Sequence, residues 1–122
     1  MKVGIDLVSI ERVEKILNRT ANFKTKNFAE SELNYAKTRR SEAETLAGIF
    51  AAKEAFLKAL GKGLGAINLT NIELLRQKSG QPCLSLTGKA QELAKEQGLK
   101  FAVSATHTEK YASVVVVAYR EL

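Results

Sequence analysis

Two carboxylates that lie far apart in the chain each stand in apolar surroundings. Asp6 lies in the middle of the run Val3-Gly-Ile-Asp-Leu-Val8, and Glu54 lies in the long apolar segment 46–60. Buried acids are rarely left unpaired, and two that meet cannot both stay ionised without a cation. If the fold brings them together, oxygen ligands with little His or Cys favour Mg²⁺, which completes its shell with water and phosphate oxygens. The pair therefore predicts a Mg²⁺-dependent enzyme that acts on a phosphate ester.

Three lysines near Glu54 are candidates for neutralising the remaining phosphate charge: Lys53, Lys58 and Lys62. Glu54 and Lys58 share one helix face, so an alternative is an ion pair that only supports the helix, typically worth ~0.2–0.5 kcal/mol. The rest of the segment is apolar and offers these charges little water, and desolvating a charge is costly. We therefore favour a cluster that forms one wall of a site.

The segment 46–60 is predicted to form a buried central helix, because small or apolar residues go nearly all the way round it. Ser41-Glu-Ala-Glu44 has the form of a capping box before it, and the glycines of 61–65 end it. Ahead of it we expect a strand over 3–8, a helix capped by Ser9 that runs to about residue 18, and a helix from about residue 28 with Ser31 as a possible cap.

The C-terminal half changes character towards strands. We expect a hairpin of 72–76 with 82–86, a helix over 89–97 ended by Gly98, and an antiparallel pair of strands at 101–105 and 112–119. The fold class is therefore α+β: an N-terminal strand and helices, a long buried central helix, and an antiparallel sheet in the C-terminal half. We expect residues 1–122 to form one domain.

Composition limits the compartment and the partners. The chain has 122 residues, 45% of them hydrophobic, with no apolar run near the ~20 residues that span a bilayer and no signal-peptide core, so we expect no membrane partner. The single cysteine, Cys83, fits a reducing compartment, and we expect a cytoplasmic location. The net charge of +6 indicates an anionic partner, which is a nucleic acid, a phosphorylated cofactor or an acidic protein.

Basic residues gather on one face of the first helix: Arg12, Lys15 and Arg19. Three charges alone are typical of a solvated face, but the basic excess continues to Arg40, with eight Lys or Arg against three Glu from Arg12 onwards. This favours a docking surface for an acidic partner. Aromatic residues suited to stacking on bases are not interleaved with the charges, which argues against nucleic acid.

Two weaker signals lie elsewhere. His107 is the only histidine and lies where a strand ends, a position that is more often structural or solvated than catalytic. Gly61, Gly63 and Gly65 could let the backbone approach a phosphate. They follow a helix instead of opening one, so they match neither the dinucleotide fingerprint nor the P-loop.

Two other function classes compete with a Mg²⁺-dependent enzyme site as the interpretation of these residues. A basic, non-enzymatic nucleic-acid-binding module accounts for the net charge but leaves Asp6 and Glu54 unexplained; it would bind arbitrary DNA with steep salt dependence and no metal requirement. A simple Mg²⁺-dependent phosphohydrolase would attack small phosphate esters without any protein substrate.

Two separated motifs add a resemblance to a known family. Val3-Gly-Ile-Asp-Leu-Val-Ser-Ile-Glu-Arg-Val13 resembles the N-terminal motif of the bacterial holo-(acyl carrier protein) synthases, and the stretch from Leu46 to Gly63 resembles their second motif. Gly80-Gln-Pro82 and Ser104-Ala-Thr-His-Thr108 are similar to later motifs. The likeness covers the whole chain in order and length. The family is that of the small, single-domain 4′-phosphopantetheinyl transferases.

The resemblance implies transfer of 4′-phosphopantetheine from coenzyme A to a serine of apo-acyl carrier protein, releasing adenosine 3′,5′-bisphosphate, for fatty acid biosynthesis. It also implies a homotrimer with active sites at subunit interfaces. Residue by residue, it assigns Mg²⁺ binding to Asp6 and Glu54, catalytic contact with the phosphates to Lys58, coenzyme A binding to Lys58, Lys62, Gly63, His107 and Thr108, and carrier docking to Arg12, with Lys15 and Arg19 on the same helix.

The chain departs from the family pattern at three positions. Many members have Arg where this chain has Ile49, which leaves one phosphate contact that the resemblance implies open. Many have Thr at the position of Lys62, so Lys62 is a candidate to replace part of that charge. Thr106 stands where Ser is frequent. The motif leaves the general base open between a metal-bound water and a carboxylate.

Overall fold

The computed structural model describes residues 1–121 and confirms the α+β class. A three-stranded antiparallel sheet has the order β1-β5-β4, and a separate hairpin pairs β2 with β3. In chain order the elements are β1 (Lys2–Ser9), α1 (Ile10–Arg19), α2 (Phe23–Asn27), α3 (Glu30–Lys37), α4 (Glu42–Ala59), the 3₁₀ helix η1 (Leu69–Asn71), β2 (Ile72–Arg76), β3 (Pro82–Leu86), α5 (Gly88–Gln97), β4 (Lys100–His107) and β5 (Tyr111–Tyr119).

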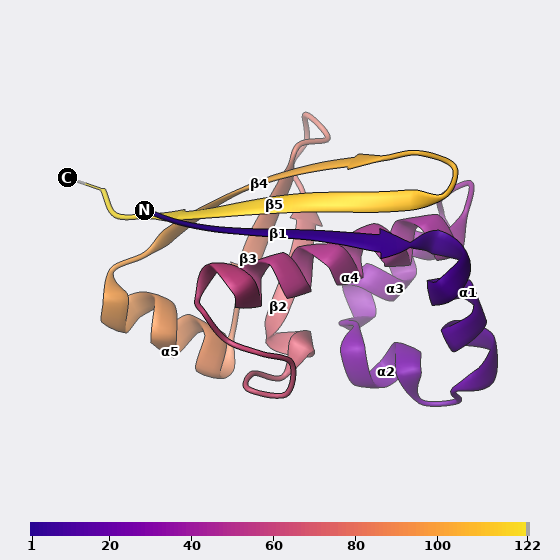
Figure 1. The fold of residues 1–122 in the computed structure, drawn as a ribbon, viewed down its shortest axis with the longest axis horizontal. Coiled ribbons are helices and arrows are strands. Elements are labelled where there is room, and N and C mark those ends of the chain that lie inside the picture. The colour runs from indigo at the N-terminus through magenta and orange to yellow at the C-terminus, as the bar shows by residue number, and fades with distance from the viewer. Residues whose placement is uncertain (122) are drawn as a thin grey trace.

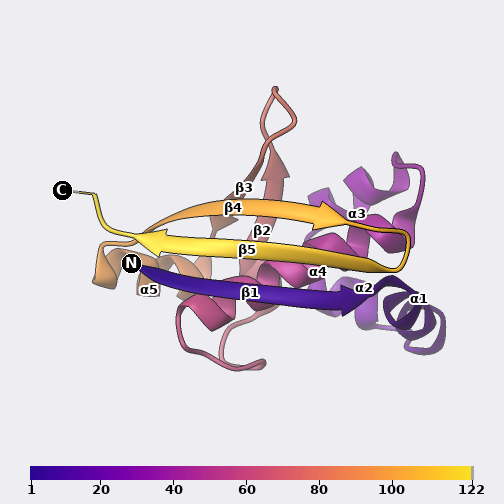
Figure 2. The same ribbon diagram turned by 45° about the horizontal axis from the view of Figure 1, so that its top comes forward.

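The central helix α4 lies along one face of the three-stranded sheet, with β5 in the middle of that sheet (Figures 1 and 2). Side chains alternate between the two faces of a strand, so every second residue of β5 points at the helix. The inward set consists of Ala112, Val114, Val116 and Ala118, all buried. The hydrophobic core therefore forms between this face of the sheet and α4, as the almost wholly apolar sequence of the helix predicts.

Strand β1 approaches α4 more closely than a side chain would permit. A Cβ atom built on Gly4 would lie 1.9 Å from the carbonyl oxygen of Ala55 and 2.5 Å from the backbone nitrogen of Ala59. Only glycine fits there. Because side chains alternate along a strand, Asp6 points to the same side as Gly4 and is 7% exposed. The close contact therefore aims the Asp6 carboxylate at the helix that carries Glu54.

A buried ion pair fixes α4 to the elements on its other side. Lys53 is fully buried, and its Nζ lies 2.7 Å from Glu32 Oε1 on α3. The same ammonium donates to the carbonyl oxygens of Leu69 at 2.7 Å and Ile72 at 2.8 Å. Burial lowers the pKa of Lys53, and the charge of Glu32 opposes that shift. Our prediction that Lys53 neutralises phosphate is therefore wrong, because all three of its donors are used within the core.

Most of the expected helix boundaries are confirmed, with two differences. Ser9 caps α1 and Ser41 caps α4, each accepting a hydrogen bond from the backbone three residues on. Ser31 is not a cap, because α3 begins at Glu30 and the Glu32 carboxylate accepts the Ala29 N–H at 2.8 Å instead. The short helix α2 was not expected from the sequence. Within residues 1–121, no helix is both long and apolar enough to cross a membrane.

Removing one partner of the Lys53–Glu32 pair should destabilise the protein strongly, because the other charge stays buried. We expect Lys53→Met or Glu32→Gln to lower the free energy of unfolding by about 3–5 kcal/mol in urea denaturation. The double variant should lose less than the sum of the two single losses, since it leaves no unpaired buried charge. Losses below about 1 kcal/mol in both single variants, the size typical of a surface pair, would contradict this role.

Candidate active site

The structure brings together Asp6, Glu54 and Lys58, which the sequence had singled out. Lys58 reaches from the last turn of α4 to β1, where its Nζ lies 3.0 Å from Asp6 Oδ1 and 3.0 Å from the carbonyl oxygen of Ile5. Among the described residues, Lys58 therefore forms its ion pair with Asp6. The alternative, an ion pair with Glu54 that only supports the helix, is wrong.

Glu54 faces the Asp6 carboxylate across the contact between α4 and β1. Burial raises the pKa of Glu54 to about 7, and a hydrogen bond with Asp6 and the charge of Asp6 add to the shift, while the charge of Lys58 opposes it. Two ionised carboxylates in this arrangement repel each other, and a bound cation relieves that repulsion. The electrostatics of the pair therefore favour a bound cation.

One oxygen of the pair is positioned to bind such a cation. Asp6 Oδ2 is buried and, when both acids are ionised, has no hydrogen-bond donor within residues 1–121. An orphaned carboxylate oxygen beside a second carboxylate fits a hard divalent cation such as Mg²⁺. Within the described part of the chain no third acid, His or Cys joins them, so water and substrate oxygens would have to complete the shell.

Two hollows meet at Glu54. On one side a small pocket of about 180 Å³ is lined by Glu54 and Lys58 together with Lys62, Gly63 and Leu64 of the loop after α4. On the other side a groove of about 350 Å³ lies between α1 and α4, lined among others by Arg12, Val13, Ile16, Phe50 and Glu54. A substrate that enters from either side reaches the same carboxylate.

The three basic residues expected on the docking helix are not equivalent. Arg12 lines the groove that leads to Glu54. Lys15 pairs with Glu11 on the surface of α1, with 3.1 Å between Nζ and Oε1. Arg19 is the exposed last residue of the helix. Only Arg12 is therefore brought to the carboxylates.

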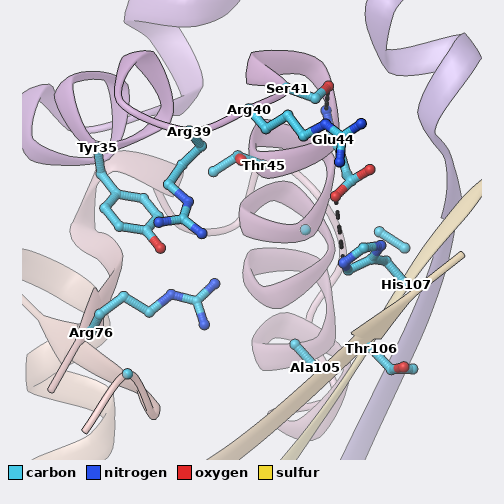
Figure 3. A pocket seen from close by; sticks show the side chains of 13 residues that line it. Tyr35, Arg39, Arg40, Ser41, Glu44, Thr45, Arg76, Ala105, Thr106 and His107 are labelled. Carbon is cyan, nitrogen blue, oxygen red and sulfur yellow. Dashed lines mark hydrogen bonds and ion pairs between the residues drawn. The ribbon is translucent and has the colours of Figure 1, made fainter. Parts of the chain in front are cut away.

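Away from the two hollows at Glu54, a second pocket, of about 420 Å³, lies at the opposite end of α4 and carries a concentration of positive charge (Figure 3). The guanidinium groups of Arg39 and Arg76 lie 5.5 Å and 5.7 Å from the centre of the Tyr35 ring. Arg40 also lines the pocket, and His107 faces Glu44, with 3.4 Å between Nε2 and Oε1. The combination of an aromatic ring with three arginines suits a planar, anionic ligand.

The two clusters are separate within one chain. Glu44 and Glu54 stand ten residues apart on α4, which corresponds to about 15 Å along the helix axis. His107 lies beside Glu44, so the structure does not bring it to the carboxylates. Thr108 lies at the turn between β4 and β5, where its hydroxyl accepts hydrogen bonds from the backbone N–H groups of Lys110 and Tyr111.

Sequence reasoning missed part of the second pocket. The sequence around Tyr35 does not mark it as a binding residue, and Arg76 is only the last residue of the strand expected over 72–76. The single local signal was the Arg39-Arg40 pair before the helix cap. Ile49, which replaces an arginine common in the family, is 2% exposed in the hydrophobic core and contributes no charge to this pocket.

The sequence of this chain is similar to those of known proteins. Residues 2–115 match the family model described as the 4′-phosphopantetheinyl transferase superfamily. The holo-[acyl-carrier-protein] synthase of Caldanaerobacter subterraneus is 36% identical over 117 residues, which is 95% of this chain and 92% of that protein. The corresponding protein of Halothermothrix orenii is 38% identical over 117 residues, 94% of each.

Solved structures have the same fold. The Chronobacterium ammoniagenes ACPS–CoA complex superposes with a TM-score of 0.89 at 30% identity, covering 99% of this chain and 98% of that one. The holo-(acyl-carrier-protein) synthase of Bacillus anthracis in complex with CoA (3′,5′-ADP) has a TM-score of 0.82 at 30% identity, covering 98% and 96%.

The carboxylate pair makes a testable contribution to stability without metal. In EDTA, the raised pKa of Glu54 means that the folded state binds more protons than the unfolded state, so stability falls as pH rises from about 4.5 through about 7. At pH 8 we expect Glu54→Gln to melt at or above the temperature of the parent, and at pH 5 the difference should shrink. Mg²⁺ should raise the melting temperature of the parent much more than that of the variant.

Glu44→Gln is the matched control for this experiment, because Glu44 is also a partly buried acid on α4 but pairs with His107. It should keep the response of the parent to Mg²⁺. If Glu54→Gln melts well below the parent in EDTA at pH 8 and responds to Mg²⁺ as the parent does, Glu54 is a structural acid. Protein concentration must be fixed, because the melting temperature of an oligomer depends on it.

Proposed function

This chain belongs to the 4′-phosphopantetheinyl transferase superfamily, and we propose that its reaction is the transfer of 4′-phosphopantetheine from coenzyme A to a serine of apo-acyl carrier protein. The products are holo-acyl carrier protein and adenosine 3′,5′-bisphosphate, and the modified carrier serves fatty acid biosynthesis. The observation that carries the proposal is the cluster of Asp6, Glu54 and Lys58, in which an acid with one unpaired oxygen, a second acid and an ammonium meet.

The chemistry is a displacement at phosphorus. The serine oxygen forms a bond to the phosphorus next to pantetheine, the bond from that phosphorus to the oxygen of the departing adenosine 3′,5′-bisphosphate breaks, and the serine proton passes to a base. Catalysis of such reactions is mostly positioning and charge neutralisation. Mg²⁺, held by Asp6 and Glu54, would neutralise charge on the diphosphate. The ammonium of Lys58 would bind the phosphate oxygens from the α4 side.

The second pocket is proposed to bind the nucleotide end of coenzyme A. Its three arginines supply charge for a phosphate, and the Tyr35 ring supplies a flat surface beside them. His107 and Thr108, which the family motif assigns to coenzyme A, lie at the same end of the sheet. These arginines would compensate for the charge that is missing at Ile49. Lys62 and Gly63 would contact the other end of the cofactor near Lys58.

We propose that the enzyme is a homotrimer, because one chain does not bring its two clusters together. The outer face of β1 exposes Val3, Ile5 and Leu7 to 58%, 60% and 65%. An apolar strip of this kind favours contact with another subunit. A neighbouring copy would place its arginine pocket opposite the carboxylates and complete the site at the interface. Light scattering gives the number of copies directly.

The acidic carrier protein is proposed to dock on α1, next to the groove that leads to Glu54. Arg12 lies in that groove, and Lys15 and Arg19 extend the positive face along the helix. Complementary charge mainly speeds encounter and selects the partner. The reaction is proposed to take place in the cytoplasm.

Mass spectrometry of apo-acyl carrier protein incubated with coenzyme A, Mg²⁺ and this protein tests the function. We expect the carrier to gain one phosphopantetheine moiety with the parent and none with Asp6→Asn or in EDTA. Hydrolysis of simple phosphate esters without modification of the carrier would support the phosphohydrolase alternative and overturn the proposal.

Reversing the charge of Arg12 tests the docking surface. Arg12→Glu should raise the KM for the carrier and weaken its salt dependence, while the KM for coenzyme A hardly moves, because the change acts on encounter with the acidic partner. Lys15→Glu, on the same helix face but already paired with Glu11, should have a smaller effect. Equal damage to both KM values in Arg12→Glu would place Arg12 in the cofactor site instead.

A further inference from the structure

The cation that sits on the metal-binding carboxylate in this structure is a side chain of the protein itself. The Nζ of Lys58 lies 3.0 Å from Asp6 Oδ1 and donates also to the carbonyl oxygen of Ile5 at 3.0 Å. Asp6 is almost fully buried in this pair, with 8% of its side chain exposed. The ammonium therefore satisfies one oxygen of Asp6 from within the chain.

Lys58 is free to leave this position, in contrast to Lys53. The side chain of Lys58 is 55% exposed and lines the open pocket that also contains Lys62 and Gly63. Its ammonium can turn from β1 towards that pocket by rotation about its own side-chain bonds, which requires no movement of α4. Lys53 is fully buried with three acceptors around its ammonium and has no such alternative.

The same ammonium is required in two places during the proposed reaction. A divalent cation on Asp6 repels an ammonium that lies 3.0 Å from one oxygen of that carboxylate. The diphosphate of coenzyme A attracts the ammonium into the adjoining pocket. Each ligand therefore removes an obstacle to the other.

We propose that Lys58 is a resident counter-ion of Asp6 that is displaced by Mg²⁺ and recaptured by the diphosphate, so that it couples the binding of the metal to that of coenzyme A. This inference rests on the proposed function and adds how the metal and coenzyme A affect each other's binding at its site. Without coenzyme A, Lys58 competes with Mg²⁺ for Asp6. With coenzyme A bound, Lys58 is held on the phosphates and Asp6 is open to the metal.

The first measurement is the affinity for Mg²⁺ alone, by calorimetry and by the rise in melting temperature, without coenzyme A. Lys58→Met keeps the length of the side chain and removes its charge. Exposed ion pairs are weak, so we expect this variant to bind Mg²⁺ about two- to fivefold more tightly than the parent. Lys62→Met is the matched control, because Lys62 lies in the same pocket and has no ion pair with Asp6 among the described residues.

The second measurement repeats the Mg²⁺ titration with saturating coenzyme A and no carrier protein, so that no turnover occurs. Coenzyme A should tighten Mg²⁺ binding in the parent, and the tightening factor should be severalfold smaller in Lys58→Met. By linkage, Mg²⁺ must change the affinity for coenzyme A by the same factor in each protein, which gives an internal check. Lys58→Gln is a second variant without the charge, and it should behave as Lys58→Met does. Circular dichroism of all variants checks that they are folded.

Two outcomes overturn the inference. One is that Lys58→Met binds Mg²⁺ alone no more tightly than Lys62→Met does, and the other is that the tightening factor is the same with and without the Lys58 ammonium. Neither affects the proposed function, which is judged by modification of the carrier by the parent enzyme. If the parent fails to modify the carrier, the proposed function itself is wrong.

Discussion

At Gly4 the backbone of β1 passes so close to α4 that a Cβ atom would lie 1.9 Å from the carbonyl oxygen of Ala55. The candidate site depends on this contact. Because a strand alternates its side chains, the residue two positions on, Asp6, has to point at the same helix. Because Glu54 precedes Ala55 on that helix, the two acids meet. The candidate site is thereby built from residues of two elements that pack without an intervening side chain.

The neighbouring residues Lys53 and Glu54 show how one helix serves both stability and chemistry. Lys53 points into the core, where Glu32 and two carbonyl oxygens satisfy its ammonium completely. Glu54 points at a second carboxylate, and the result is a raised pKa and an acid pair that is short of positive charge. The ion pair of Lys53 fixes the helix, whereas Glu54 is available for a ligand. An unsatisfied group on a rigid element is what binding of a cation requires.

The sequence singled out the carboxylates and Lys53 on the same ground, and the prediction for Lys53 is wrong. A charged residue within an apolar helix indicates that something must compensate it, but the pattern does not say whether the partner is a ligand or another side chain. For Lys53 the partner is Glu32, on a different helix, and no spacing rule links the two. The caps at Ser9 and Ser41 were predictable because a cap is a local hydrogen bond. The cation–π contact between Arg76 and the ring of Tyr35 was not predictable, because only the packed fold brings the two together.

Strand β1 links assembly to chemistry through its alternation. Its odd-numbered side chains, Val3, Ile5 and Leu7, form the exposed apolar strip, while Gly4 and Asp6 face α4. Ile5 takes part in both, since its side chain points outwards and its carbonyl oxygen accepts a hydrogen bond from Lys58. The strand that exposes this apolar strip is therefore also the strand that carries Asp6, the ion-pair partner of Lys58. In the trimer that we propose, contact at this strip would therefore bear directly on the strand that places Asp6 opposite Glu54.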